Sequence, residues 1–259
     1  YQGIFGDSQF NGQFLALGSF AFLILKPKTS IKIRYLNFCI FLLGVFYILL
    51  AGSRSAMGGF IIGLLFLFIF SKLRIKFYSI ILGIFAILSL YLIAPNNGIF
   101  SRADRMGNDL DFRQSIWQEA FEIIKEHPLL GIGLGNFQNY TFKYHQDLYL
   151  EISPGELLYF TQPENGYLTI LVEQGGVVFA IFCLFFLIPI FNFFNNVFLR
   201  NIDLKALYIV AALGSWLTAF NTVYSLSDYR IELTVIMYLF LLIMITSKNN
   251  SNYFMNNNL

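Results

Sequence analysis

Three charged residues stand in apolar or small-residue surroundings, where they could perform chemistry. Arg54 lies among Ser and Gly residues between two apolar stretches, and such small residues let backbones approach closely and leave room for a ligand. Arg113 falls near the middle of the apolar face of an expected helix, in line with Trp117, and Glu164 directly precedes another apolar stretch. A guanidinium is a planar fork that suits phosphate, and a carboxylate can accept a proton. These residue types therefore indicate an anion site with a base beside it.

Each of these residues also has a structural interpretation. An isolated arginine at the end of a membrane span is usually an interfacial anchor, which would explain Arg54, and Arg113 could extend its side chain to water from the first helical turn. The sequence leaves both interpretations open. Asn165 is a good helix N-cap, which is sufficient to explain it, and the helix dipole would stabilise an acid at Glu164. The dipole is a less complete explanation for Glu164, which would share a water-exposed membrane mouth with both arginines.

The composition places these residues in a membrane protein. Of 259 residues, 57% are hydrophobic and only 12% are charged, whereas soluble domains carry about 25% charged residues. Cys39 and Cys183 both fall in apolar runs, far apart, with neither a disulfide framework nor metal-ligand spacing. The expected fold class is all-α, a polytopic transmembrane helix bundle.

Apolar stretches of about 20 residues predict seven membrane spans. They are residues 11–25, 36–52, 56–71, 77–94, 166–191, 206–224 and 231–247. The predicted organisation is four spans in residues 1–94, an extracytoplasmic loop domain at 95–165, three spans in 166–247, and a disordered polar cytoplasmic tail at 248–259. Because the sequence starts with Tyr1, we expect an N-terminally truncated fragment that lacks upstream spans.

The distribution of basic residues orients the bundle. Seven spans place ten Lys and Arg residues on one face together with a single acid, Asp203, and this face is expected to be cytoplasmic. Almost all other acids fall on the opposite face. The large loop at 95–165 is therefore expected outside the cytoplasmic membrane.

The loop domain is expected to contain an amphipathic helix. Asp111 and Gln114 have capping-box spacing, and His127-Pro128 ends the helix. The helix would lie on the membrane surface or over the mouth of the bundle. Its apolar half comprises Phe112, Ile116, Trp117, Ala120, Phe121, Ile123 and Ile124. The glycine-rich segment 128–137 that follows predicts a tight turn packed against the bundle.

Glu173 is expected inside the fifth span, where a carboxylate costs roughly 2.5–3.5 kcal/mol unless it faces the bundle interior. We expect it to have a structural hydrogen-bonding role, with the polar stripe of Ser215, Thr218 and Asn221 as its partners. No metal site is predicted, since His127 and the other loop histidine, His145, have no metal-ligand spacing.

Four short stretches occur in a fixed order along the chain. They are Gly6 to Gly12 (GDSQFNG), Gly52 to Ala56 (GSRSA), Arg113 and Trp117 continuing to Pro128–Gly133 (PLLGIG), and Asn165 to Leu168 (NGYL) followed by Glu173–Gly175 (EQG). In these stretches and their membrane sidedness the chain resembles the bacterial O-antigen ligase and Wzy-type O-antigen polymerase superfamily. The third stretch is the most specific.

The resemblance implies an inverting, metal-independent membrane glycosyltransferase with no cofactor. Its donor would be an oligosaccharide on undecaprenyl pyrophosphate, presented at the outer face of the bacterial cytoplasmic membrane. By this likeness Arg54 and Arg113 bind the pyrophosphate, Trp117 and Asn165 also contact substrate, and Glu164 is the catalytic base. The lipid bilayer and other polysaccharide-assembly membrane proteins are candidate partners, and no nucleic acid is expected.

One departure separates two activities within the superfamily. Ligases typically carry His immediately before the Asn of the fourth stretch, where this chain has Glu164, so either Glu164 replaces that base or the catalytic group lies elsewhere. Since polymerases are more tolerant at this position, a polymerase of O-antigen, capsule or exopolysaccharide repeat units is favoured over a ligase that transfers polymer to lipid A-core. A polysaccharide transporter or flippase would instead distribute charges along the spans. A non-catalytic scaffold would not explain why Arg113 lies on the apolar face of the expected helix.

Overall fold

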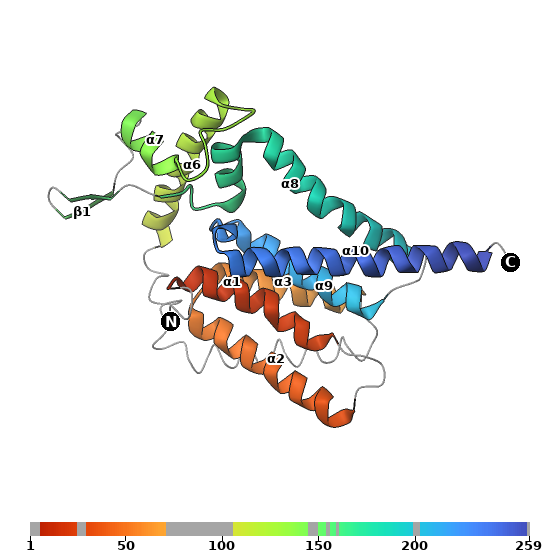
Figure 1. Cartoon of the computed structure of the whole chain (residues 1–259). Helices are drawn as coiled ribbons and strands as arrows, with labels where there is room; N and C mark the ends of the chain where they lie inside the picture. The colour runs from red at the N-terminus through yellow and green to blue at the C-terminus, as the bar shows by residue number, and fades with distance from the viewer. Residues whose placement is uncertain are drawn as a thin grey trace. The chain divides into compact units, whose positions relative to one another are not determined.

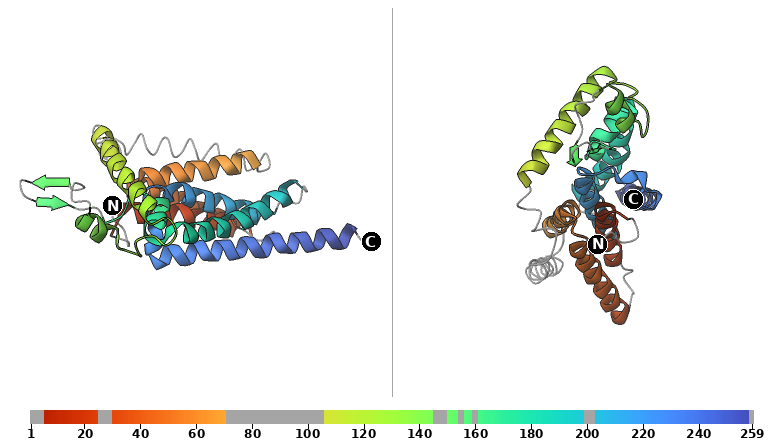
Figure 2. Two further views of the ribbon diagram at one scale, coloured as in Figure 1. Left: turned by 90° about the horizontal axis from the view of Figure 1, so that it is seen from above. Right: turned by 90° about the vertical axis from the view of Figure 1, so that its left-hand side faces the viewer.

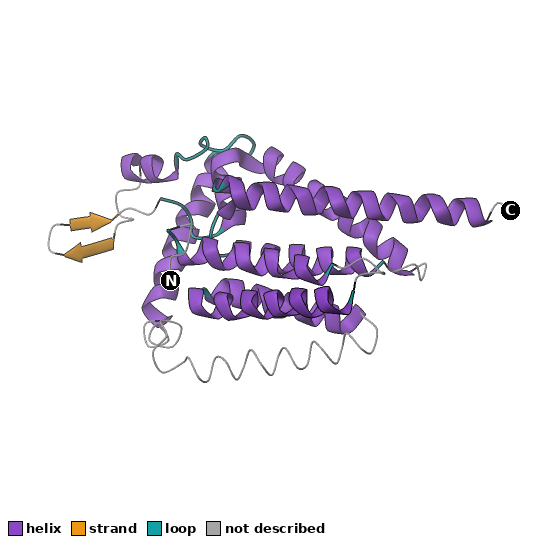
Figure 3. Cartoon of the chain, turned by 60° about the horizontal axis from the view of Figure 1, so that its bottom comes forward, coloured by secondary structure: helices purple, strands orange, loops and turns teal. Residues whose placement is uncertain are grey.

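The chain folds as an all-α membrane protein with one small β-hairpin (Figure 1). The computed structural model describes residues 6–24, 30–70, 106–144, 150–153, 156–158, 161–198 and 203–257. Its elements are α1 Ser8–Ser19, η2 Phe20–Leu23, α2 Ile31–Ala51, α3 Arg54–Phe70, α6 Met106–Glu126, α7 Phe137–Tyr144, β1 Leu150–Ser153, β2 Glu156–Leu158, α8 Gly166–Phe198, α9 Leu204–Phe220, η5 Ser225–Ser227 and α10 Tyr229–Asn257. The antiparallel hairpin of β1 and β2, which the sequence did not predict, carries the two strands of the described part (Figure 3).

Within the described residues, three helices are long and apolar enough to cross a membrane. They are α2 over Ile31–Ala51, α8 over Gly166–Val197 and α10 over Tyr229–Ser247, while α3 and α9 are shorter apolar helices. These five helices coincide with five of the predicted spans. The predicted first span forms α1 and the short η2 turn instead of one long helix, and the predicted span at 77–94 lies outside the described residues.

The tail was predicted wrongly. Helix α10 continues through the polar residues to Asn257, so the chain from 248 to 257 is helical rather than disordered (Figure 2). A helix that is already formed propagates by adding one hydrogen bond per residue, which outweighs the weak helix preference of Asn.

The chain divides into two compact units. The first comprises residues 1–100, 186–219 and 225–259, and in it α1 packs against α2 and α3. The Phe20 ring lies 6.2 Å from that of Phe41 and 5.1 Å from that of Phe60, all three nearly without solvent exposure. Close packing depends on Gly12, where a Cβ would lie 2.7 Å from that of Ser53.

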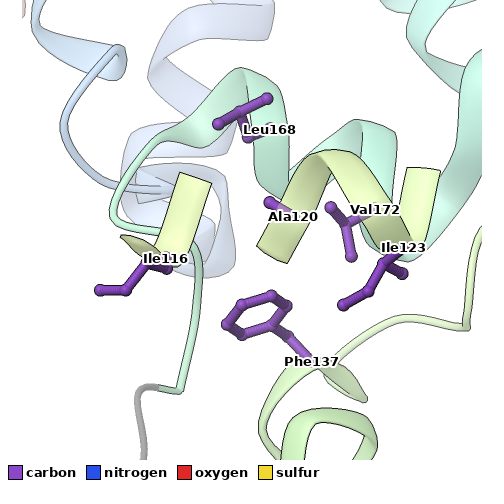
Figure 4. Packing of buried hydrophobic residues seen from close by; sticks show 6 residues of the cluster. All are labelled: Ile116, Ala120, Ile123, Phe137, Leu168 and Val172. Atoms are coloured by element: carbon purple, nitrogen blue, oxygen red, sulfur yellow. The ribbon is translucent and has the colours of Figure 1, made fainter. Parts of the chain in front are cut away.

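The second unit comprises residues 101–185 and 220–224. Its core forms where α6 packs against α7 and the first turns of α8 (Figure 4). The buried side chains of this core are Ile116, Ala120, Ile123, Phe137, Leu168 and Val172. The amphipathic character of α6 is confirmed, although Phe121 lies outside the buried face with 51% of its surface exposed.

Helix α6 begins earlier than predicted. It starts at Met106 rather than at the capping box of Asp111. A cap contributes only about 1 kcal/mol, so an uninterrupted ladder of backbone hydrogen bonds can run past it. The predicted end at His127-Pro128 is confirmed, since α6 ends at Glu126.

Candidate functional site

Arg113, Trp117 and Glu164 meet in the second unit, at the entrance to α8. The Arg113 Nη2 atom lies 3.5 Å from the Glu164 Oε2 atom, and the two side chains are 30% and 24% exposed. One turn further along α6, the Trp117 indole N–H donates to the Pro163 carbonyl oxygen at 3.1 Å. The i, i+4 spacing on α6 aims both side chains at the same short segment. The pair is therefore partly buried but still exposed to solvent, as a site for a charged ligand must be.

Glu164 holds an unusual backbone conformation. Its φ of 50° is the one positive value among the described residues that are not glycine. A left-handed backbone costs such a residue roughly 1–2 kcal/mol, and strain of this kind concentrates at binding and catalytic sites. The Trp117 bond to the preceding carbonyl and the Arg113 contact hold this segment in place.

Asn165 has the predicted role of a helix cap and a second role that the sequence did not indicate. Its Oδ1 atom accepts from the Tyr167 and Leu168 amides at 3.0 and 3.2 Å, which satisfies amides of the first turn of α8. Its Nδ2 atom donates to Asn221 Oδ1 at 2.9 Å. Asn165 therefore ties the start of α8 to the segment 220–224 within the same unit.

The residues from Pro128 to Asn136, called the glycine turn below, are bonded into a break in α8. At Gly175 the backbone leaves the helix with φ 79° and ψ 176°. Two carbonyls of α8 accept from amides of the glycine turn, and two amides of α8 donate to its carbonyls. The four bonds are Ile132 N to Val172 O (2.9 Å), Gly133 N to Glu173 O (2.8 Å), Gly176 N to Pro128 O (2.8 Å) and Val177 N to Leu129 O (3.4 Å).

Gly131 and Gly175 are required at this junction by the lack of space for a side chain as well as by their backbone conformation. A Cβ on Gly131, which has φ 66°, would lie 2.6 Å from the Glu173 carbonyl oxygen, and a Cβ on Gly175 would collide with the Leu129 carbonyl oxygen. The predicted tight turn is therefore confirmed, and α8 is the element that it packs against.

Glu173 has the predicted structural role but different partners. Its Oε2 atom accepts from the Gly135 amide at 2.9 Å and its Oε1 atom from the Phe137 amide at 3.4 Å. Of the expected partners, Asn221 binds Asn165 and Thr218 donates to the Gly214 carbonyl, while the buried Ser215 hydroxyl has no hydrogen-bond partner among the described residues. The carboxylate thus sits at the N-terminus of α7, where the helix dipole stabilises a negative charge.

The Glu173→Gln variant is expected to destabilise the protein by about 1–3 kcal/mol. Glutamine keeps one acceptor oxygen but turns an amide N–H₂ toward a backbone N–H, so one of these buried amides loses its partner. Thermal unfolding of the purified protein in detergent measures the loss, with Glu122→Gln on the exposed face of α6 as control. Equal melting temperatures for the Glu173→Gln variant and the wild type would show that these bonds are not needed.

Tyr140 connects α7 to the end of α6. Its hydroxyl donates to Glu126 Oε2 at 2.9 Å and lies 3.2 Å from His127 Nε2. Burial, together with the hydrogen bond to Glu126, raises the pKa of Tyr140 from 10.0 to about 12. The folded protein therefore favours the neutral phenol more than the unfolded chain does.

This raised pKa predicts a loss of stability at alkaline pH. The contribution is complete below pH 10.0 and disappears as the pH rises to about 12, because the unfolded chain then releases the proton more readily than the folded one. Over this range the wild type should lose stability relative to a Tyr140→Phe variant, measured by unfolding at a series of pH values. A constant difference between the two proteins would contradict the assignment.

Arg54 lies in the first unit, at the first position of α3. Gly52 ends α2 with φ 70°, and Ser53, only 3% exposed, begins the next helix by accepting from the Ala56 amide at 3.4 Å. Arg54 itself is half-buried. A cation at a helix N-terminus opposes the dipole, so this position does not favour arginine on structural grounds alone.

A further charged pair in the first unit escaped the sequence analysis. The Asp228 carboxylate accepts from Arg230 Nε at 2.9 Å and from Nη2 at 2.6 Å, and this contact lowers the pKa of Asp228. An Asp two residues before an Arg does not by itself indicate a site, so sequence reasoning had no ground for selecting this pair. Among the described residues, no group of three His, Cys, Asp or Glu side chains lies close enough to hold a metal ion.

The apolar helices indicate a membrane protein. The charged pair of Arg113 and Glu164 lies in its second unit. A family model described as O-antigen ligase matches residues 39–183, a segment that includes Arg54, Arg113, Glu164 and the glycine turn. This match covers more than half of the sequence, and the chain belongs to the O-antigen ligase family. The resemblance found in the sequence motifs is thereby confirmed.

A relative from Haemophilus influenzae (strain ATCC 51907 / DSM 11121 / KW20 / Rd), described as an uncharacterized protein, is 27% identical over 202 residues. The aligned region covers 71% of this chain and 49% of the relative. The chain thus spans about half the length of the curated relative that it matches.

Proposed function

We propose that this protein is a membrane glycosyltransferase that polymerises oligosaccharide repeat units carried on undecaprenyl pyrophosphate. Membership of the O-antigen ligase family supports a glycosyl-transfer function. The observation that carries the proposal is the pairing of Arg113 with Glu164, 3.5 Å apart and partly exposed. A cation for the leaving group and a carboxylate for the incoming hydroxyl are the two groups that such a transfer needs.

Arg113 binds the donor pyrophosphate in this proposal. A guanidinium has five N–H donors in a planar fork, so the contact with Glu164 leaves donors for phosphate oxygens. The bound pyrophosphate competes with Glu164 for the cation and frees the carboxylate. Fixed positive charge can stabilise the leaving group without a metal ion, and the mechanism that we propose is metal-independent.

Glu164 is the base. An acceptor hydroxyl transfers its proton to a Glu164 carboxylate oxygen, and the hydroxyl oxygen forms a bond to the anomeric carbon of the donor sugar. The bond from that carbon to the pyrophosphate oxygen breaks, and its electron pair stays on undecaprenyl pyrophosphate. Attack from the face opposite the leaving group inverts the anomeric configuration.

Three further residues have parts in the proposal. Trp117 positions Glu164 through the Pro163 carbonyl and offers an indole ring to a sugar, and Asn165 fixes the first turn of α8 directly after Glu164. Arg54, which begins α3 in the other unit, is also proposed to bind pyrophosphate, because a helix N-terminus favours a bound anion.

The enzyme is proposed to work at the outer face of the bacterial cytoplasmic membrane, with residues 95–165 outside. Glu164 in place of the histidine typical of ligases favours a polymerase over a ligase that transfers polymer to lipid A-core. The sidedness of basic residues in the sequence supports this orientation.

Complementation of a polymer-deficient host tests the role of Arg113. The Arg113→Ala variant should lower the transfer rate by about 10²- to 10³-fold, the usual effect of removing one group that stabilises transition-state charge, and the polymer ladder should disappear from gels. Lys125→Ala serves as control, because Lys125 is an exposed cation on the same helix. Full-length polymer from Arg113→Ala at normal protein levels would refute the assignment.

The same gels separate the two activities. Loss of a polymerase leaves lipid A-core that carries one repeat unit, whereas loss of a ligase leaves polymer on undecaprenyl pyrophosphate. The proposal predicts the first pattern for Arg113→Ala and Arg54→Ala. The second pattern would show that the protein is a ligase and not a polymerase.

A further inference from the structure

The glycine turn exposes three leucine side chains. Leu129, Leu130 and Leu134 are 66%, 80% and 69% exposed. Transfer of a leucine side chain from water to an apolar environment gains about 1.5–3 kcal/mol, so three such residues on one short turn form an apolar surface that marks an interaction site.

The position of the turn along α8 indicates what covers these leucines. The stretch from Gly176 to Val197 is about 33 Å long at 1.5 Å per residue, so it alone can cross a hydrocarbon layer of about 30 Å. The break at Gly175 then coincides with one end of the span. The turn is bonded to Gly176 and Val177, the first residues of this stretch.

Leu129 adjoins exposed apolar residues of α8. Val177, whose amide bonds to Leu129, is 48% exposed, and Ile181, one turn further on, is 61% exposed. In a helix that crosses a membrane, side chains exposed in this way face lipid. The glycine turn extends that surface beyond the end of the span.

Most of the backbone amides of the turn are bonded within the protein, as non-helical backbone close to a membrane requires. This degree of bonding suits the headgroup level better than the hydrocarbon core, so the side chains of the turn, and not its backbone, would reach the acyl chains. Five amides of the turn donate to the protein. They are those of Gly131 to His127 O (3.2 Å), Ile132 to Val172 O, Gly133 to Glu173 O, Gly135 to the Glu173 carboxylate and Asn136 to Gly133 O (3.2 Å).

Residues typical of the membrane interface follow the turn on α7. Tyr144 is 58% exposed, and Lys143 Nζ lies 4.9 Å from the centre of its ring. Tyrosine and lysine are favoured at the level of lipid headgroups, beside apolar residues that reach the acyl chains.

We propose that the glycine turn is a membrane anchor, in which Leu129, Leu130 and Leu134 insert among the lipid acyl chains next to the start of the α8 span. The anchor holds the second unit, with Arg113 and Glu164, at the level of the lipid headgroups. The inference rests on membrane embedding and on local geometry, and it holds whether or not Glu164 is a base.

Spin labels at single cysteines test the anchor. The full-length protein, with Cys39→Ser and Cys183→Ser, is reconstituted in vesicles of phosphatidylethanolamine and phosphatidylglycerol and labelled at Leu130→Cys or, independently, at Leu134→Cys. Collisions with oxygen, which concentrates in lipid, are compared with collisions with a water-soluble nickel chelate. Glu122→Cys on the exposed face of α6 is the matched control, since the Glu122 side chain is 59% exposed.

At Leu130 and Leu134, collisions with oxygen should exceed those with nickel, and the order should reverse at Glu122. Nickel collisions that exceed oxygen collisions at both leucines would place the turn in water and overturn the proposal. Exclusion of both reagents would also overturn it, because a second copy or another protein would then cover the leucines. A Glu122 label that reports the same lipid depth as Leu130 would likewise contradict an anchor confined to the turn.

Discussion

Replacing Glu164 by Gln is expected to lower the rate of glycosyl transfer by about 10²- to 10⁴-fold. The amide has the shape of the carboxylate and keeps an oxygen that can accept from Arg113, so the segment entering α8 should retain its conformation. The amide cannot take up the proton of the acceptor hydroxyl. The loss should therefore appear in kcat, with little change in KM for the donor.

The matched control for this variant is Glu122→Gln, which removes an exposed carboxylate from α6 that pairs with Lys125. It should leave the rate and the melting temperature near those of the wild type. A Glu164→Gln enzyme that polymerises at the wild-type rate would exclude Glu164 as the base and leave its strained backbone without a catalytic explanation.

The second large effect is expected from Gly175→Ala. The pair φ 79°, ψ 176° lies in a region open essentially only to glycine, and the added Cβ would meet the Leu129 carbonyl oxygen. Strain and overpacking together should cost about 2–5 kcal/mol. The bonds of Gly176 and Val177 to the glycine turn would be lost first, because the chain can relieve the clash only by moving the turn away from α8.

Gly135→Ala is the control, since Gly135 also has a positive φ of 71° but no atom within 4 Å of an added Cβ. It should cost only the conformational strain, roughly 1–2 kcal/mol. Melting temperatures in detergent compare the two variants, at roughly 2–4 °C per kcal/mol for a chain of this size. Equal losses would show that the contact between the glycine turn and α8 adds nothing.

Much of the helical architecture could be predicted from the sequence because it depends on local signals. Long apolar stretches locate α2, α8 and α10, and the 3.6-residue period identifies the buried face of α6. Asn165 was recognised as a cap, since a cap is formed by residues within one turn of it. Arg113 was placed in line with Trp117, and both now prove to contact one segment, 163–164.

The remainder could not be predicted because it depends on contacts between distant parts of the chain. Gly175 lies in an apolar stretch that has the hydropathy of an uninterrupted span, and only the bonds to the glycine turn compensate for breaking it. The polar stripe of the sixth span was predicted to supply the hydrogen-bond partners of Glu173, because helical periodicity identifies such a stripe. Its actual partners are backbone amides. Because every residue except proline has one, no pattern of residue types identifies them as partners.

The most direct test of the proposed polymerase activity is elongation by the purified full-length protein supplied only with lipid-linked repeat units. The expected product is a ladder of oligomers on undecaprenyl pyrophosphate, with one undecaprenyl pyrophosphate released for each repeat added, and the ladder should persist when divalent metal ions are chelated. A folded protein that yields neither longer oligomers nor released undecaprenyl pyrophosphate would contradict it.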